Sequence, residues 1–371
     1  MKNNQFRSVL HIVRGTLRRL LPASSHKRME AWLDRKIDHA MLRDNRLIQK
    51  HVILWHWPEY MPYPLDLKHP KNFNEKIQWL KINYRDYRIP VCADKYLAKK
   101  YLAKKGYGKY IPKNLGVFTD MDSFRELYKT LPGRFVVKSS EGCGGVSICY
   151  DKTNWDMSEL EDRLQEWRKR CYASSGGEWF YDIFEPTFFV EEFIEQDPDE
   201  EPHGTSKGSG TAKVSDLYDY KFFCFQGEPL YSYITMNRQS HEKMTFDFYD
   251  KDWHFLDFTR VYPNSGRVMP RPKHYEKMLE IAEKISEEFP FVRVDFMEGN
   301  GRLYIGELTF CPGGGWECFD PLVWDRKFGD CLQLPSKREC RAKEKEYKAF
   351  LKRVAEGRYQ NISLRSDARQ R

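Results

Sequence analysis

Apolar residues recur at two spacings along the chain, and these spacings separate expected helices from expected strands. Helical spacing runs through residues 1–21 and ends at Pro22. Further helices are expected at 27–57, 94–105, 160–171, 274–289 and at the start of 336–371. Alternating or continuous apolar runs predict strands at 134–138, 146–150, 187–193, 218–225, 229–236, 291–297 and 302–308.

Polar and turn-forming segments separate these elements. Residues 58–72 are rich in Pro and Tyr and predict an extended connector. Residues 195–216 are rich in Gly, Ser, Pro and acidic residues, which predicts a mobile loop or insertion. The pair Asn300-Gly301, inside the turn 298–301, indicates a hairpin between the last two strands. We find no internal repeat.

Composition narrows the class of protein. A chain of 371 residues suits one large lobe or two to three intermingled lobes. No run of 18 apolar residues predicts a membrane span, and Arg14, Arg18 and Arg19 interrupt the first apolar stretch, so no signal peptide is expected. Nine scattered cysteines without a Cys-x-x-Cys pair argue against a zinc site and a disulfide framework, and favour a reducing cytoplasm.

The net charge of +8 belongs to the N-terminal segment. Residues 1–50 hold twelve Lys or Arg and four Asp or Glu, and the remainder holds fifty of each sign. A nucleic-acid-binding enzyme would more often carry a basic groove through its body, so no nucleic-acid partner is expected. The basic amphipathic pattern of residues 1–21 either lies on an anionic membrane surface or docks on the protein itself with its basic face in water.

The segment 291–315 carries the strongest chemistry. Arg293 and Asp295 share one face of a strand, and Glu307 and Thr309 share one face of its hairpin partner, because side chains alternate. Two carboxylates and a short polar oxygen suit Mg²⁺, which also takes phosphate oxygens. The glycines after Pro312 leave the backbone open to close approach. The alternative is an ordinary hairpin with a polar solvent face.

A second segment, 135–150, places Lys138 at the end of a strand and then a glycine-containing turn before the next strand. Consecutive N–H groups in such a turn can point at phosphate oxygens, and the lysine adds a point charge. It is not a Walker A motif, because the lysine precedes the glycines and a strand follows them. The alternative is a hairpin turn with an exposed lysine.

Two further segments carry weaker signals. The strand 188–195 ends in Glu191 and Glu192 and could present backbone groups to an adenine edge, or it could be a plain strand. Lys221 and Arg238 could lie on neighbouring strands across the turn at Gly227. Two cations on one sheet face suit a phosphoryl transition state. The alternative is surface charge.

Taken in order, these segments resemble the ATP-grasp superfamily, in its TupA-like polysaccharide-biosynthesis branch. The resemblance covers about residues 70–335 and lies in NFNEKIQWLK, ADKYLAKKYL, IPKNLGVF, FVVKSSEGCGG, FVEEFI, DYKFFCFQGEP, FPFVRVDF and IGELTFCPGGG. It implies an α+β fold in which two lobes hold ATP between antiparallel sheets, with an N-terminal helical extension. The expected divisions are an extension 1–57, an N-terminal lobe 58–114, a small lobe 115–194, a flexible loop 195–216, a large lobe with the metal site 217–335, and a charged C-terminal helix and tail 336–371.

The resemblance also implies roles for single residues. Lys95 and Lys138 resemble the two nucleotide-phosphate lysines, and Lys221 resembles the cation that contacts the γ-phosphate. The loop that closes over the phosphates corresponds to Glu141, Gly142, Gly144 and Gly145, and the adenine hinge to Glu191, Glu192, Phe193 and Ile194. Arg293 resembles the residue that steadies the acyl-phosphate and tetrahedral intermediates, and Asp295 and Glu307 resemble the Mg²⁺ carboxylates. Thr309 stands where the superfamily usually has Asn.

The implied activity is an ATP- and Mg²⁺-dependent ligase that joins a carboxylate to an amine through an acyl phosphate. The family context suggests an acidic or amino sugar, or a polysaccharide precursor, and an amine or amino acid as partners. A cytoplasmic location, at the inner face of the membrane if the substrate is lipid-linked, follows from it. Alternatives are a sugar kinase and a nucleotide- or glycan-binding protein without turnover. A glycosyltransferase is disfavoured, because the one Asp-x-Asp match, Asp250-Lys251-Asp252, is typical of a hairpin turn.

Overall fold

The computed structural model describes residues 45–170, 172, 176–197, 217–238 and 243–357. The first expected helix, most of the loop 195–216 and the C-terminal tail lie outside these residues. Among the described residues, no helix is long and apolar enough to cross a membrane. The helices are α4 (Arg46–Tyr60), α5 (Phe73–Asn83), α6 (Arg88–Ala93), α7 (Lys95–Leu102), α8 (Met121–Thr130), α9 (Met157–Arg168), α11 (Tyr275–Ser286), α12 (Val323–Cys331) and α13 (Lys337–Ala355).

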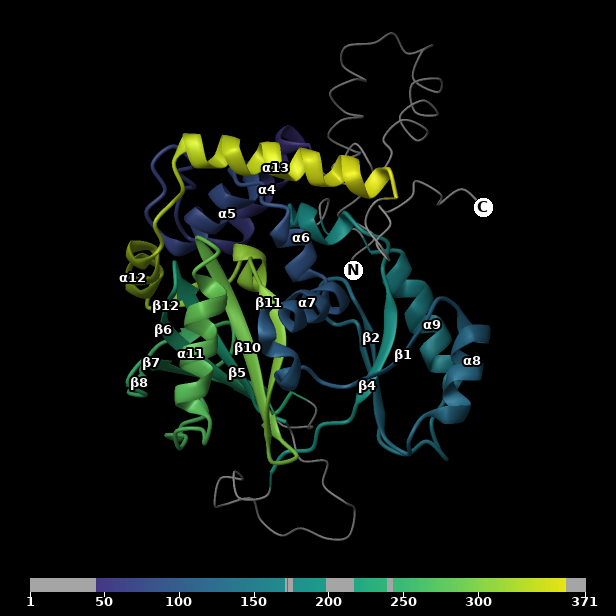
Figure 1. The fold of residues 1–371 in the computed structure, drawn as a ribbon. Helices are drawn as coiled ribbons and strands as arrows, with labels where there is room; N and C mark the ends of the chain where they lie inside the picture. The colour runs from purple at the N-terminus through teal and green to yellow at the C-terminus, as the bar shows by residue number, and fades with distance from the viewer. Residues whose placement is uncertain (1–44, 171, 173–175, 198–216, 239–242, 358–371) are drawn as a thin grey trace, which may run out of the picture.

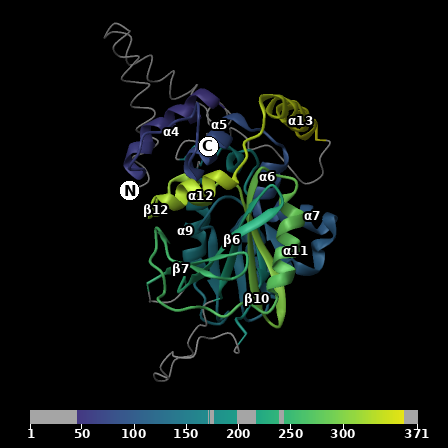
Figure 2. The same ribbon diagram turned by 90° about the vertical axis from the view of Figure 1, so that its left-hand side faces the viewer.

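The larger of the two lobes is built on a six-stranded antiparallel sheet with the order β11-β10-β5-β6-β7-β8. Its strands are β5 (Asp219–Phe225), β6 (Glu228–Met236), β7 (Thr245–Asp250), β8 (Phe255–Leu256), β10 (Phe291–Gly299) and β11 (Arg302–Thr309). The short strands β9 (Thr259–Arg260) and β12 (Phe319–Asp320) pair beside it. Helix α11 covers one face, where its apolar side packs on β5, β6 and β10 (Figures 1 and 2).

The opposite face of this sheet changes character along its strands. Phe223 and Phe225 of β5 and Phe291 of β10 pack around Phe73 of α5, whose ring lies 5.1 Å from that of Phe291. Beyond these aromatic residues the same strand faces carry Lys221, Asp295 and other charged groups. Burial of the aromatic half provides most of the local stabilisation. It also fixes the register that brings the charged half together.

The smaller lobe is a four-stranded antiparallel sheet with the order β1-β4-β2-β3. Its strands are β1 (Asn114–Phe118), β2 (Phe135–Ser139), β3 (Val146–Cys149) and β4 (Phe188–Glu192). Helices α8 and α9 cover its outer face, where buried aromatic and aliphatic side chains form a core separate from that of the larger lobe. Helix α7 lies between the two sheets (Figure 1). The α+β class with two antiparallel-sheet lobes, expected from the sequence, is therefore confirmed.

The expected elements agree with the structure in type, with shifts at their ends. The main correction concerns residues 58–60, which were expected to begin the extended connector but form the last turn of α4. Pro58 lacks the N–H that would bond to the carbonyl four residues earlier, so packing has to hold this last turn. The buried Ile53 and Trp57 hold this turn against the protein, and the N–H of Met61 bonds to the carbonyl of Trp57 at 2.9 Å. The described part of the expected helix 27–57 begins at Arg46.

The β10–β11 hairpin has the expected turn, but in a tighter form. Strand β10 continues to Gly299, so only Asn300 and Gly301 form the turn. Both have left-handed backbone angles, with φ of 52° and 70°. A two-residue turn with both φ values positive matches the twist of the flanking strands. It sets the register as far as the pair Phe296 and Ile305, and an irregularity at Gly306 then shifts the ladder by one residue so that Asp295 pairs with Glu307.

Candidate functional site

A row of polar side chains crosses the larger sheet at the level of Asp295. In the antiparallel registers, Asp295 lies opposite Glu307 on one side and Lys221 on the other, and Lys221 lies opposite Tyr233. Directly paired residues project from the same face of a sheet. The expectation that the two hairpin faces bring Asp295 and Glu307 together therefore agrees with the observed register.

Asp295 is the centre of an ion-pair cluster. Its carboxylate accepts from the Nζ of Lys221 at 2.6 Å and from the Nε and Nη2 of Arg293, both at 2.6 Å. The side chain is almost fully buried, with 3% of its surface exposed. Arg293 also donates to the Thr309 hydroxyl at 2.9 Å and to the Tyr233 hydroxyl at 3.2 Å. These contacts hold the guanidinium in one orientation in front of the carboxylate.

Glu307 is held less tightly than its neighbour. Its carboxylate lies 3.6 Å from the Nζ of Lys95, and a quarter of its side chain is exposed. Burial would raise its pKa, but the positive charges of Lys95, Arg293, Lys221 and Arg238 outweigh burial and lower the pKa below its usual value. Glu307 is therefore an ionised carboxylate at neutral pH, and within the described part of the chain its ion pair is the long one with Lys95, which suits a cation ligand.

Lys221 and Arg238 meet through a shared carboxylate that the sequence did not single out. Asp219 lies 3.3 Å from the Nζ of Lys221 and 2.7 Å from the Nη1 of Arg238. Burial opposes ionisation of Asp219, yet the two cations lower its pKa to about 2. The proximity of Lys221 and Arg238, expected from their places on β5 and at the end of β6, is confirmed.

The glycine-containing turn between β2 and β3 lies against the start of α7. The backbone N–H of Lys95 donates to the carbonyl of Ser140 at 2.7 Å, and its ammonium group donates to the carbonyl of Gly142. Gly142 and Gly144 have left-handed φ values of 56° and 69°. A side chain at Gly142 would overlap the ring of Tyr172. Glycine is thus required here both by the backbone conformation and by the close approach.

Two other members of the turn have distinct environments. The Cβ of a residue replacing Gly145 would lie 2.8 Å from the Cβ of Ser139, across the base of the turn. Glu141 is almost fully buried. From the segment after α9, the Nη1 of Arg170 donates to the carbonyl of Cys143 at 2.7 Å. The turn is therefore supported from α7 on one side and from Arg170 and Tyr172 on the other.

The expected hinge, residues 191–194, divides into side chains with different roles. The carboxylate of Glu191 lies 2.7 Å from the Nζ of Lys138 on β2 and also contacts Lys99 on α7. Glu192 points the other way and accepts from the N–H of Lys113 at 2.8 Å. The ring of Phe193 lies under the guanidinium of Arg134.

The same hinge is braced by the tip of the β10–β11 hairpin. The Nδ2 of Asn300 donates to the carbonyl of Phe193 at 3.3 Å, and its N–H donates to the carbonyl of Glu195 at 3.0 Å. Any side chain at Gly299 would overlap Ile194 and the backbone of Glu195. One hairpin therefore carries the paired carboxylates along its strands and supports the expected adenine segment at its tip.

After β11 the chain makes a tight turn, Pro312–Gly315, in which Gly313, Gly314 and Gly315 all have positive φ. Its carbonyls accept from two buried side chains of α5. Gln78 donates to Gly315 at 2.9 Å, and Lys81 donates to Gly314 at 2.5 Å. The glycines after Pro312 thus form a turn whose carbonyls are bound by side chains of α5.

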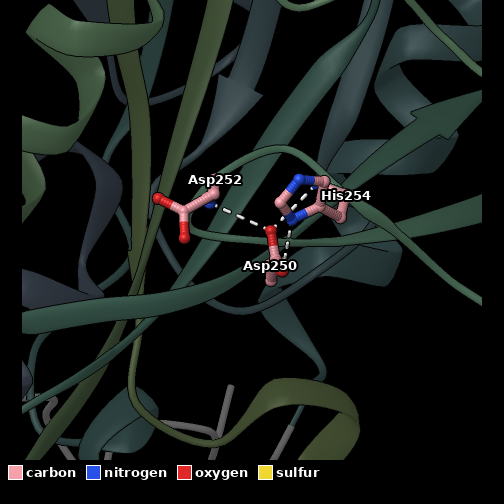
Figure 3. A group of neighbouring side chains, drawn as sticks. All are labelled: Asp250, Asp252 and His254. Carbon is pink, nitrogen blue, oxygen red and sulfur yellow. Dashed lines mark hydrogen bonds and ion pairs between the residues drawn. The ribbon is translucent and has the colours of Figure 1, made fainter.

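The Asp250-Lys251-Asp252 match forms the β7–β8 hairpin turn, as expected. Asp250 accepts from the backbone N–H groups of Asp252 and His254, both at 2.9 Å, and contacts the His254 ring at 3.0 Å (Figure 3). The three side chains lie close enough to hold a cation, but two of them are exposed. Bonding within a turn accounts for this proximity.

The structure therefore brings many of the predicted site residues together in two clusters. Lys138 and Glu191 form the smaller cluster, beside Lys99 of α7. The larger cluster contains Lys95, Lys221, Arg238, Arg293, Asp295, Glu307 and Thr309. Sequence reasoning did not identify Lys99, Asp219 or Tyr233. The signals were available in part: Lys99 follows Lys95 by one helical turn, and Asp219 precedes Lys221 by two residues on the same strand face.

The residues present fit a divalent cation with a polyphosphate. Opposed carboxylate oxygens on rigid strands are typical Mg²⁺ ligands, and Mg²⁺ usually completes its shell with phosphate and water oxygens. Asp295 and Glu307 supply the carboxylate oxygens, and the surrounding lysines and arginines suit the phosphate oxygens. Thr309 lies one row away, and its oxygen accepts from Arg293. Its position favours support of Arg293, and its role as a metal ligand stays a prediction.

Comparison with known proteins gives one family. The model of the TupA-like ATP-grasp family matches residues 75–333. Among curated proteins, none matches this chain in sequence.

Similar solved structures include two D-alanine–D-alanine ligases. The one from Bacillus anthracis, in complex with ATP, has 18% identity and a TM-score of 0.38 over 74% of this chain and 75% of that chain. The one from Helicobacter pylori has 17% identity and a TM-score of 0.33 over 71% and 70%. An N5-carboxyaminoimidazole synthase from Aspergillus clavatus has 12% identity and a TM-score of 0.33 over 61% and 46%.

Proposed function

The chain belongs to the TupA-like ATP-grasp family, and from this premise we propose that it is an ATP-dependent ligase that joins a carboxylate to an amine. The observation that carries the proposal is the pairing of Asp295 with Glu307 on one hairpin, flanked by Lys95, Lys221 and Arg293. This arrangement supplies both a metal site and a phosphate site.

The charge balance of the cleft supports a nucleotide substrate. The side chains in the two clusters are the cations Lys95, Lys99, Lys138, Lys221, Arg238 and Arg293 and the carboxylates Glu191, Asp219, Asp295 and Glu307. The cations exceed the carboxylates by two. A phosphate chain carries the negative charge that this excess requires.

The proposed reaction has two steps. A carboxylate oxygen of the first substrate attacks the γ-phosphorus of ATP, which forms an acyl phosphate and releases ADP. The amine of the second substrate attacks the acyl carbon, the bond from carbon to the phosphate oxygen breaks, and the amine loses a proton. The amide and inorganic phosphate are the products. Phosphorylation is needed because an unmodified carboxylate has no leaving group.

The chain's residues divide this work by position. Lys221, between Asp219 and Asp295, is placed to offset charge on the transferred phosphoryl group. Arg293, oriented by Thr309 and Tyr233, is placed to stabilise the oxyanion formed on amine attack. Asp295 and Glu307 would hold Mg²⁺, which when bound would offset negative charge on the phosphate chain.

We propose that the substrates belong to cell-surface polysaccharide assembly, with an acidic or amino sugar as one partner. The resemblance of the sequence to the polysaccharide-biosynthesis branch suggests this class, and the site does not distinguish which partner supplies the carboxylate. If the sugar is lipid-linked, the basic residues 1–21 bring the enzyme to an anionic membrane surface. Deletion of residues 1–21 then removes binding to anionic vesicles and leaves nucleotide affinity unchanged, whereas undiminished vesicle binding contradicts the membrane role.

The test of function is a screen of acids and amines by ADP release, with mass spectrometry of the products. The proposal requires ADP formation that depends on both an acid and an amine, together with a product of amide mass. A phosphorylated sugar without an amide identifies a kinase. ATP binding with no turnover across the screen identifies a binding protein.

A further inference from the structure

Two lysines share one buried carboxylate between the lobes. Glu191, on the central strand β4, has one carboxylate oxygen 2.7 Å from the Nζ of Lys138 and the other in contact with the Nζ of Lys99. Glu191 is 1% exposed and Lys99 is 8% exposed. The three side chains come from α7, β2 and β4, so the bridge links the helix between the lobes to the small-lobe sheet.

The bridge is unbalanced, since one carboxylate faces two ammonium groups. A buried ion pair is costly to desolvate even when it is neutral, and a surplus cation adds to that cost. Burial lowers the pKa of Lys99, and Glu191 opposes that effect only in part. A bridge that served only to join α7 to the sheet would need one lysine. The second positive charge therefore calls for an anion close by.

The geometry places this surplus charge beside the glycine turn. Lys138 precedes Ser139 at the end of β2, and the turn begins immediately afterwards. Lys95 and Lys99 lie one helical turn apart on the same face of α7. The ammonium group of Lys95 donates to the carbonyl of Gly142 in the glycine turn. The residue directly across the sheet from Lys138 is Phe189, so Glu191 reaches Lys138 diagonally and limits where its ammonium can lie.

We propose that Lys99 is a positioning residue for the nucleotide site, which acts through Glu191 to hold Lys138 at the glycine turn and supplies surplus positive charge that the phosphate chain of ATP neutralises. This inference rests on the proposed function and deepens it. It assigns to Lys99 a role in nucleotide affinity in addition to the contact between α7 and the sheet.

The test compares nucleotide binding in variants of the full chain. Lys99→Met removes the charge and keeps most of the side-chain length, and Lys99→Arg keeps the charge. Lys104→Met, on the exposed turn after α7, is the matched control. The dissociation constants of Mg²⁺-ATP and Mg²⁺-ADP are measured by titration calorimetry, because binding needs neither an acid nor an amine. KM for ATP and kcat follow once substrates are known.

We expect Lys99→Met to weaken binding of both nucleotides about tenfold, the scale of one charge-assisted contact. Lys99→Arg and Lys104→Met should remain within roughly threefold of the wild type on the same scale. The loss in Lys99→Met should appear in KM for ATP more than in kcat. Wild-type affinity in a folded Lys99→Met variant overturns the proposal and leaves Lys99 as a structural tie.

A second variant covers the case in which Lys99→Met does not fold. Lys99→Met/Glu191→Met removes the carboxylate together with one cation, and a buried ion pair can often be replaced by apolar side chains without loss of stability. We expect this variant to fold and to bind nucleotide weakly, because Lys138 has lost its anchor. Wild-type affinity there also overturns the proposal. If the wild-type chain itself binds no nucleotide, the proposed function fails instead, so the two failures are distinguishable.

Discussion

Glu307→Gln separates the metal role of this residue from any role in stability. The substitution keeps the size of the side chain and removes its charge. Among the residues that the structure describes, Glu307 has one ion pair, at 3.6 Å to Lys95, and its side chain is a quarter exposed. A long, partly exposed pair contributes about 0–1 kcal/mol. We therefore expect the free energy of unfolding to change by no more than roughly 1 kcal/mol.

The effect on nucleotide chemistry should be far larger. A group aimed at charge that develops in the transition state contributes about 3–4 kcal/mol, which corresponds to a loss of roughly 100- to 1000-fold in kcat. Removal of one of the two proposed carboxylate ligands should also raise the Mg²⁺ concentration needed for half-maximal nucleotide binding. Chemical denaturation measures the free energy of unfolding, and a Mg²⁺ titration of ADP binding measures the Mg²⁺ dependence.

The control is Glu280→Gln, which removes an exposed carboxylate from α11 on the opposite side of the sheet. It should leave stability and Mg²⁺ dependence near wild-type values. Unchanged Mg²⁺ dependence in Glu307→Gln would refute the assignment of this carboxylate to the metal. A loss of several kcal/mol in the stability of Glu307→Gln would refute the claim that the charge of Glu307 contributes little to the stability of the fold.

Three further predictions follow. Asp295→Asn removes the carboxylate between the buried cations Arg293 and Lys221 and leaves Lys221 its longer contact with Asp219. It should cost about 3–5 kcal/mol of unfolding free energy by denaturation, in contrast to Glu307→Gln, and a cost below about 1 kcal/mol would contradict this expectation. Asn300→Gly keeps the left-handed turn but removes a bond to the carbonyl of Phe193, so stability should fall by about 1 kcal/mol and KM for ATP should rise; an unchanged KM argues against bracing of the hinge. Burial raises the pKa of Glu178 to about 7 from 4.5, so its protonated form favours the fold below pH 4.5 and that stability is lost as pH rises through 7. The free energy of unfolding of Glu178→Gln, relative to that of the wild type, should therefore increase by roughly 1–3 kcal/mol between pH 4.5 and pH 8. A difference that does not change with pH would count against the shift.

The sequence predicted the hairpin well because its determinants are local. The strand period of two places Arg293 and Asp295 on one face, and the Asn300-Gly301 turn fixes the pairing of the two strands as far as Phe296 and Ile305. The shift at Gly306 that then brings Glu307 opposite Asp295 was not predicted. The face of Lys138 and the left-handed glycines after it follow from the same local rules. These features need no knowledge of distant parts of the chain.

The partners of these residues could not be predicted, because non-local packing decides them. Lys99 was recognisable only as part of a helix, and its contact with Glu191 depends on how α7 lies between the two sheets. Asp219 gains importance from Arg238, which arrives from the next strand. Pro58 suggested a helix end, but burial of Trp57 carries α4 through it to Tyr60. Tertiary contacts outweighed local preference in each case.

The central claim is that Asp295 and Glu307 serve an ATP-dependent ligation through an acyl phosphate. The most direct measurement uses an acid substrate from the ADP-release screen with both carboxylate oxygens labelled as ¹⁸O, and follows the label in the released phosphate by mass spectrometry. We expect one ¹⁸O in each phosphate released by the wild type, and loss of this product in Glu307→Gln. Amide formation with unlabelled phosphate would contradict it.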